Sequence, residues 1–297
     1  MMDYVIETHD LSKQFGTVHA VSGLNLRVAR NQVTGFLGRN GAGKSTTIKM
    51  LLGMTHPTSG SGLLLGHSFT DPKQDLEARR KVAYCGEDKQ LYAYMTVKQL
   101  IHFTASFYPD WRSEVAASLL HQFQLPPDRK VKALSKGMRT KLALLLALAR
   151  RPALLILDEP TEGLDPVSIE ELLQTLSGLP ADGTTVFFSS HQISEVERIA
   201  DRVCIIDRGR LAVDLSLDEI RQDHRRITLS FPHQPPEHLF DMPEVRSIET
   251  NGRQMIVVSS HGADAVVERA KTADAVVVDV APINLRELFL GTVQDHQ

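Results

Sequence analysis

The sequence predicts an α/β fold in which a helical block is inserted into a mixed sheet and a smaller α+β unit follows. Three observations support this fold class. Short strand-like runs alternate with helical runs over the first 220 residues. Helical character is concentrated between about residues 70 and 150, and a second order of elements begins beyond residue 220. We therefore expect one large domain at residues 1–220 and an accessory domain at residues 221–297.

The composition is that of an ordinary globular chain. Of its 297 residues, 42% are apolar and 23% are charged, which excludes wholesale disorder. The formal net charge is -3, and because nucleic-acid-binding domains usually carry a basic surplus, no nucleic-acid partner is expected. The longest unbroken apolar run, Leu142 to Ala149, is far shorter than the roughly 20 residues of a membrane span. Two distant cysteines, Cys85 and Cys204, indicate a reducing compartment.

The elements of the large domain follow from apolar patterns and turn residues. Strands are expected at 4–8, 20–28, 32–37 and 63–65, with Gly23 and Asn31 marking breaks or turns, and a helix is expected at 44–52, where Gly53 ends it. Helices are expected at 96–107 and 113–123 and from about 134 to 150, because apolar residues recur there at three- and four-residue spacing. Strands return at 153–157, 184–189 and 203–207. The helical subdomain is therefore expected at about 88–150.

The accessory domain has its own order of elements. We expect strand 225–231, a short helix 236–240, strands 245–250 and 253–259, helix 263–272, strand 275–280 and a closing helix at 283–290. Asn251-Gly252 between two apolar runs indicates a hairpin, because both residues tolerate the positive φ of a type I′ turn. The order strand-helix-strand-strand-helix-strand is that of the split βαβ, ferredoxin-like unit.

A glycine-rich segment carries the first chemical signal. The segment from Gly38 to Ser45 reads G-x-x-x-x-G-K-S, the pattern of a phosphate-binding loop between a strand and a helix. Glycines let several backbone N–H groups converge on one anion, and the helix N-terminus adds its dipole. Lys44 would reach the β- and γ-phosphates, and Ser45 would hold magnesium. The candidate nucleotide-binding residues of this loop are Gly38, Asn40, Gly41, Ala42, Gly43, Lys44, Ser45 and Thr46.

Two further strands end in polar residues. The apolar run from Leu154 ends in Asp158 and Glu159, and ligands of buried parallel sheets lie beyond the carboxyl ends of the strands. Asp158 suits a magnesium ligand, and Glu159 suits a base that activates water. Alone, this pair would be read as an acidic strand end at the surface; together with the phosphate-binding loop it favours a catalytic site. His191 ends the next strand and can contact the γ-phosphate, although a lone histidine would not be selected.

Together these residues resemble the nucleotide-binding subunit of ATP-binding cassette (ABC) transporters, a P-loop NTPase family, over roughly residues 3–220. The resemblance makes Ser135 and Gly137, at the start of a helix, part of the signature motif 134–138. It implies that Glu159 is the catalytic base and that His191 is the switch histidine. By position, the resemblance makes Asp158 the magnesium carboxylate and Glu162 to Asp165 the loop that spans the dimer. It also places Phe15 as the ring that stacks on adenine and Glu87 as the switch residue that senses nucleotide and magnesium.

The motifs depart from the family pattern at three positions. Lys136 and Met138 replace glycine and glutamine of the signature, and Glu87 replaces the usual switch glutamine. These departures resemble bacterial exporter ATPases that work with a separate membrane subunit, including antibiotic-resistance and lantibiotic-immunity types. The resemblance implies ATP and Mg²⁺ as cofactors and a homodimer as the working form. It also implies docking on an integral membrane subunit at the cytoplasmic face of the inner membrane, with Glu87 and residues 91–107 facing that partner.

Two other functional classes remain open from the sequence. One is a soluble ATPase of the same superfamily that acts in translation or DNA repair, although such proteins usually carry two cassettes or a long coiled coil. The other is a regulator whose accessory domain binds a ligand while the cassette only senses nucleotide. Measurable hydrolysis that Glu159→Gln abolishes would separate the main hypothesis from a pure sensor.

Overall fold

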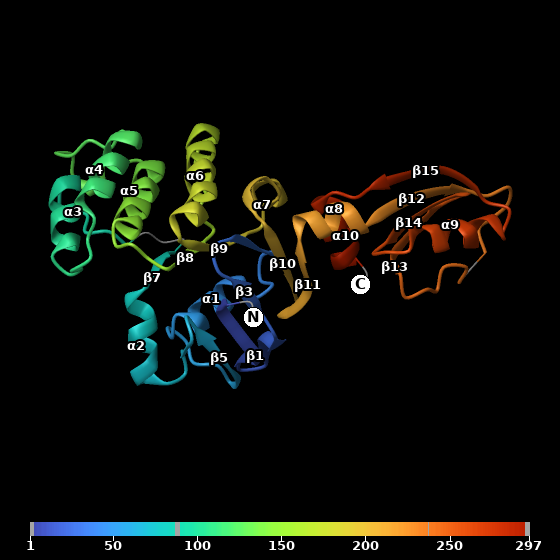
Figure 1. The fold of residues 1–297 in the computed structure, drawn as a ribbon, viewed down its shortest axis with the longest axis horizontal. Coiled ribbons are helices and arrows are strands. Elements are labelled where there is room, and N and C mark those ends of the chain that lie inside the picture. The colour runs from blue at the N-terminus through green and yellow to red at the C-terminus, as the bar shows by residue number, and fades with distance from the viewer. Residues whose placement is uncertain (1–2, 87–89, 237, 295–297) are drawn as a thin grey trace. The chain divides into compact units, whose positions relative to one another are not determined.

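The computed structural model describes residues 3–86, 90–236 and 238–294. The chain divides into two compact units, Met1–Leu211 and Ala212–Gln297 (Figure 1). The sequence placed the boundary after residue 220, because the new element order becomes visible only there. In the structure the second unit already begins within strand β11 (Arg210–Ser216) and includes helix α8 (Leu217–Asp223).

A six-stranded sheet forms the centre of the first unit. Its order is β11-β10-β4-β9-β8-β7, and the five strands from β10 to β7 run parallel. Their bounds are β10 (Arg202–Asp207), β4 (Val33–Leu37), β9 (Thr185–Ser190), β8 (Leu154–Asp158) and β7 (Val82–Cys85). Every residue of β4, β8 and β9 is buried. Continuous apolar runs therefore mark strands that are covered on both faces, as the sequence predicted.

A second, largely antiparallel sheet lies beside it in the same unit. Strand β1 (Tyr4–Phe15) pairs with β2 (Val18–Leu24), β3 (Arg27–Ala29) and β5 (Ser59–Leu64), and β6 (His67–Ser68) extends β5. The run expected at 20–28 is broken near Gly23, as the sequence indicated: this glycine takes a φ of +61°, and the Asn25 side chain accepts from the Asp10 N–H at 2.9 Å. The chain turns there and forms two short strands. Apolar side chains from both sheets share one core.

The helices of the first unit fall into two groups. Helices α1 (Lys44–Leu51), α2 (Pro72–Arg80), α6 (Pro166–Gly178) and α7 (Ile193–Ile199) accompany the sheets. Helices α3 (Val97–Ala105), α4 (Ser113–Gln122) and α5 (Lys136–Leu148) lie between β7 and β8 in the chain and gather into a separate block in Figure 1. The short 3₁₀ helices are η1 (Val131–Ala133) and η2 (Leu179–Asp182). In the described part of the chain, no helix is both long and apolar enough to cross a lipid bilayer.

The second unit is a four-stranded antiparallel sheet in the order β13-β14-β12-β15. Its elements are β12 (Arg225–Ser230), β13 (Val245–Asn251), β14 (Gln254–Ser259), α9 (Ala263–Lys271), β15 (Val276–Pro282) and α10 (Leu285–Gln294). The strand order is compatible with the predicted ferredoxin-like unit. The expected helix at 236–240 is wrong for the described residues, because His238 takes a φ of +62° and the chain turns to bury Phe240.

Candidate active site

The glycine-rich loop leaves β4 and opens helix α1. Gly43 takes a φ of +111°, and a Cβ atom there would lie 2.5 Å from the Ala20 carbonyl oxygen. At Gly38 a Cβ would lie 2.6 Å from the Ile206 carbonyl oxygen. No real side chain tolerates these approaches, so both positions require glycine. The loop therefore wraps closely enough for its N–H groups to face an anion at the start of α1.

A cavity of about 350 Å³ opens against this loop. Its lining combines residues of the loop with the polar ends of the strands: Ala20, Asn40, Gly41, Gly43, Lys44, Ser45, Thr46, Glu159, Glu162 and His191. Gly38 and the buried Ala42 belong to the same loop but do not line the cavity. The sequence-predicted loop, the acidic strand end and the switch histidine thus meet at one place.

Lys44 is a buried cation whose ammonium has three polar contacts. Its side chain is 6% exposed, and its ammonium donates to the carbonyl oxygens of Gly38 at 2.7 Å and Arg39 at 3.3 Å. The third contact is an ion pair of 3.2 Å with Glu159 Oε1. An ammonium has three protons, so these partners use its full donor capacity. A phosphate oxygen that takes Lys44 must therefore replace one of them.

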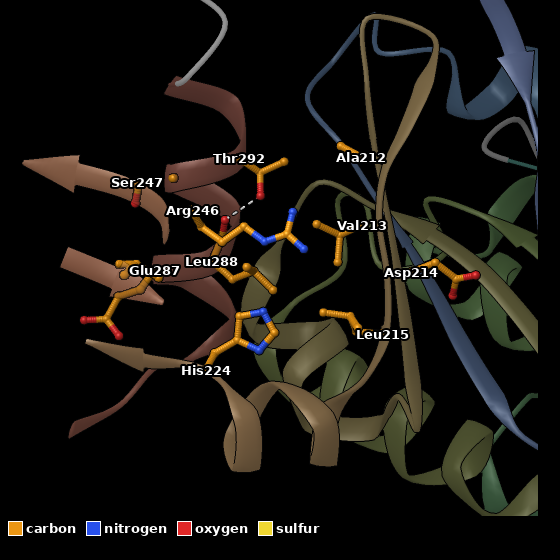
Figure 2. Close-up of a pocket in the computed structure, with 12 residues that line it drawn as sticks. Ala212, Val213, Asp214, Leu215, His224, Arg246, Ser247, Glu287, Leu288 and Thr292 are labelled. Atoms are coloured by element: carbon orange, nitrogen blue, oxygen red, sulfur yellow. Dashed lines mark hydrogen bonds between the residues drawn. The ribbon is translucent and has the colours of Figure 1, made fainter. Parts of the chain in front are cut away.

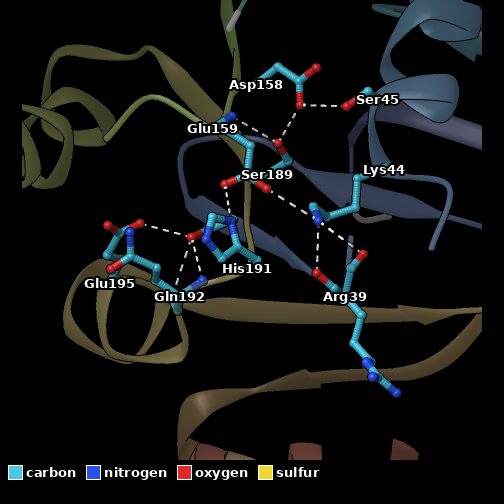
Figure 3. Close-up of polar contacts among 11 residues, drawn as sticks. Arg39, Lys44, Ser45, Asp158, Glu159, Ser189, His191, Gln192 and Glu195 are labelled. Atoms are coloured by element: carbon cyan, nitrogen blue, oxygen red, sulfur yellow. Dashed lines mark hydrogen bonds and ion pairs between the residues drawn. The ribbon is translucent and has the colours of Figure 1, made fainter. Parts of the chain in front are cut away.

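Glu159 is held between Lys44 and His191 (Figure 3). Its Oε2 lies 2.8 Å from His191 Nδ1, while its Oε1 faces Lys44. The backbone of Glu159 takes a φ of +47°, a left-handed conformation that costs a non-glycine residue about 1–3 kcal/mol. The residue is 8% exposed and lines the cavity. Strain of this kind fixes the direction of a side chain, and here it places the carboxylate at the cavity wall.

Asp158 and two serines form the adjoining cluster. Ser189 Oγ donates to Asp158 Oδ1 at 2.6 Å and accepts from the Glu159 N–H at 3.0 Å, while Ser45 Oγ donates to the same Asp158 oxygen at 3.2 Å. Sequence reasoning missed Ser189. The one signal that could have indicated Ser189 is its position: a hydroxyl side chain at the end of the strand that follows the strand ending in Asp158.

Glu195 is a second residue that the sequence did not indicate. It lies on α7, is 3% exposed, and its Oε2 accepts from Ser190 Oγ at 2.8 Å. Burial raises the pKa of the Glu195 carboxyl, and the nearby charge of Glu159 adds to the effect, while hydrogen bonds and His191 oppose it. A buried acid thus stands behind the strand end that carries His191 (Figure 3).

Besides Gly38, Ala42 and Asp158, four predicted site residues lie outside the cavity lining or outside the described residues. Ser135 caps α5 by accepting from the Met138 N–H at 3.1 Å, and Gly137 lies against Ser168 of α6. Phe15 is 52% exposed at the end of β1, with the Lys13 ammonium 4.9 Å from its ring centre. Glu87 falls in residues 87–89, outside the described residues.

Comparisons with known proteins agree with this geometry. The family model described as ABC transporter matches residues 21–162. The bacitracin transport ATP-binding protein BcrA of Bacillus licheniformis is 36% identical over 228 residues, which cover 76% of this chain and 74% of the relative.

Two solved structures share the fold. An ATP-binding subunit of an ABC transporter is 31% identical, with a TM-score of 0.66 over 73% of this chain and 92% of the other. CbiO1 of Clostridium perfringens, part of the ABC transporter complex cbiONQ, is 27% identical, with a TM-score of 0.64 over 72% and 89% of the two chains. The chain therefore belongs to the ABC transporter family, as an ATP-binding subunit of the ATPase type.

Proposed function

We propose that this chain is the ATP-hydrolysing subunit of a bacterial exporter, that it works as a homodimer with Mg²⁺, and that it docks on a separate membrane subunit. The observation that carries the catalytic part is the position of Glu159 between Lys44 and His191 at the wall of the cavity. Glu159 and His191 follow two neighbouring parallel strands of one sheet, and Lys44 begins helix α1. Their geometry supports a base, a phosphate-binding cation and a second polar contact to the terminal phosphate.

Glu159 is the proposed base. Its Oε2 sits at hydrogen-bond distance from His191, so the histidine orients the carboxylate toward the cavity. A carboxylate in this place can accept the proton of a water that attacks the γ-phosphate. His191 is more exposed than its partner, with a side-chain exposure of 39%, and can also contact the phosphate.

Lys44 would change partners when nucleotide binds. In the structure its ammonium is shared between two loop carbonyls and Glu159. Transfer of the third contact from Glu159 to a phosphate oxygen keeps the ammonium fully paired and frees one carboxylate oxygen for water. Phosphate binding and release of the base are thereby linked through one side chain.

Ser45 and Asp158 are suited to bind a magnesium ion. Ser45 Oγ and Asp158 Oδ1 lie 3.2 Å apart, and both are hard oxygen donors of the kind that Mg²⁺ prefers. Bound there, the ion would neutralise charge on the phosphates. Because Mg²⁺ usually takes only one or two protein ligands and completes its shell with water and phosphate, a larger carboxylate cluster is not required. Glu87 is proposed as a further contact on the resemblance alone.

A homodimer would complete the site. Ser135 and Gly137 do not line the cavity of their own chain, and Ser135 presents the N-terminus of α5 at an exposed position. We propose that this end meets the terminal phosphate bound by the partner chain, since a helix N-terminus favours anions. Phe15, exposed beside β2, is proposed to stack on the adenine ring.

The helical block offers a surface for the membrane partner. Tyr92, Tyr94 and Phe107 are 50%, 66% and 63% exposed. They form one aromatic cluster with Phe103, with ring centres 5.0–6.0 Å apart in edge-on contacts. An exposed aromatic group of this size favours a protein contact. Docking there would hold the chain at the cytoplasmic face of the inner membrane, and the name of the bacitracin transport relative supports a role in transport.

The test is a substitution of the base. Glu159→Gln keeps the shape but removes the proton acceptor, so ATP should bind while turnover falls by roughly 10²–10⁴. Gel filtration with ATP and Mg²⁺ should then show a trapped dimer. Glu170→Gln is a matched control, because this half-exposed carboxylate pairs with Arg198 on the surface. Unchanged hydrolysis and a monomer with ATP would refute the assignment.

A further inference from the structure

The second unit contains a cavity of its own, of about 380 Å³. Figure 2 shows it between the β11 segment, the sheet and helix α10. Val258 and its cross-strand neighbour Ser247 form the floor, and Gly291 allows α10 to approach closely, because a Cβ there would lie 3.0 Å from Ser247 Oγ. Val213, Leu215 and Leu288 add apolar walls. The volume lies within the range of small-molecule sites.

His224 is the unusual polar group of this cavity. The residue is 3% exposed, and neither ring nitrogen has a hydrogen-bond partner among the described residues. A buried donor that is left unpaired loses its hydrogen bonds to water without replacement, which is unfavourable. Figure 2 shows the imidazole and the Arg246 guanidinium turned toward the same space. A buried imidazole without a well-aligned hydrogen-bond partner among the described residues indicates that a ligand in the cavity can supply one.

The charges around the cavity favour an anion. Glu287 lines it too, but its Oε1 accepts from Arg226 at 2.8 Å and its Oε2 from the Asn284 N–H at 3.1 Å, so its charge is compensated. The side chain of Asp214 points away from Arg246 in Figure 2. Arg246 is exposed and lines the mouth. The guanidinium is thus the charge that a ligand in this space would meet.

We propose that the second unit binds a small monocarboxylate, with its carboxylate between Arg246 and His224 and a short aliphatic chain against Val213, Leu215 and Leu288. Burial lowers the pKa of His224, the backbone of Glu219 opposes this and the positive Arg246 adds to it, and the neutral imidazole that burial favours offers a single N–H. One arginine then balances one negative charge. The apolar walls disfavour inorganic phosphate, which carries more charge and no apolar body.

The proposal is tested by titration calorimetry on the full chain with three probes: hexanoate, hexanol and inorganic phosphate. Hexanoate should bind at least about tenfold more tightly than either of the others. Only hexanoate has both a carboxylate that accepts from Arg246 and His224 and an aliphatic chain that packs on the apolar walls. Arg246→Gln should weaken hexanoate binding about tenfold. Arg253→Gln, an exposed arginine at the hairpin of the same sheet, should leave binding unchanged.

A second variant tests the other proposed hydrogen-bond donor, His224. His224→Phe keeps a buried ring but removes the donor, and it should lower hexanoate affinity to a similar degree while ATP hydrolysis continues. Equal binding of hexanol and hexanoate, tighter binding of phosphate, no detectable heat with hexanoate, or unchanged affinity in Arg246→Gln would each overturn the proposal. The readout is ligand affinity, so a failure here leaves the ATPase proposal intact.

Discussion

Ser189 is expected to hold the two acidic residues of the ATP site in place. Its hydroxyl is fully buried, donates to Asp158 Oδ1 at 2.6 Å and accepts from the Glu159 N–H at 3.0 Å. Ser189→Ala removes both contacts and introduces no new group. It leaves a carboxylate oxygen with the weaker Ser45 contact alone and a buried N–H without a partner. Each loss costs about 1–3 kcal/mol, so the free energy of unfolding of the first unit should fall by about 2–6 kcal/mol.

The chain offers a direct probe for this measurement. Trp111 is its single tryptophan and belongs to the first unit, so urea titration followed by tryptophan fluorescence reports on that unit. ATP turnover should fall as well, because the backbone anchor of Glu159 is lost. Ser177→Ala is the matched control: this exposed hydroxyl donates to a helix carbonyl, and its loss should change stability by less than about 0.5 kcal/mol. If Ser189→Ala behaved like the control in both assays, the reasoning would be refuted.

Three further substitutions test the loop and the buried acid. Lys44→Ala should weaken binding of a fluorescent ATP analogue about 10- to 100-fold, since a charge-assisted contact is lost; undiminished affinity would rule out its role. Gly43→Ala should destabilise the first unit by about 1–3 kcal/mol or more in the Trp111 assay, because its Cβ would meet the Ala20 carbonyl at 2.5 Å; an unchanged midpoint would contradict this. The raised pKa of Glu195 means that the folded chain binds its proton more tightly, so the associated stability is present below the ordinary glutamate pKa and is lost as the pH rises through the raised value. Glu195→Gln should flatten that decline in urea titrations above the ordinary glutamate pKa, and an unaltered pH profile would exclude Glu195 as its cause.

The sequence predicted β4, β8, β9 and β10 of the central sheet because their burial leaves a continuous apolar signal, but it did not predict β7, which is only four residues long, or β11, none of whose residues is fully buried. It also predicted that the phosphate-binding loop, Glu159 and His191 would meet, since each follows a parallel strand and such strands end at one edge. The helix at 236–240 failed for a local reason. A positive φ at His238 satisfies the burial of Phe240 better than a helical turn would, and no spacing pattern encodes that choice.

Ser189, Glu195 and His224 escaped prediction because their roles arise from tertiary contacts. Ser189 matters only because β9 lies beside β8 in parallel register, with Asp158 opposite Ser189. Glu195 is buried where α7 packs, and His224 is buried at the wall of the cavity that α10 also lines. A serine, a glutamate or a histidine in isolation has an ordinary surface interpretation, so only the structure distinguishes these three.

The departure at Lys136 shows how a residue that breaks the family pattern is accommodated. Gly163 lies in the loop expected to span the dimer and takes a φ of +68°, and a Cβ there would lie 2.6 Å from Lys136 Nζ. The lysine side chain therefore lies across the bare face of this glycine. Gly137 packs nearby against Leu164 and Ser168. The start of α5 and the loop at Gly163 thus pack together, and Lys136 forms part of the surface that the proposed homodimer would bring to its partner chain.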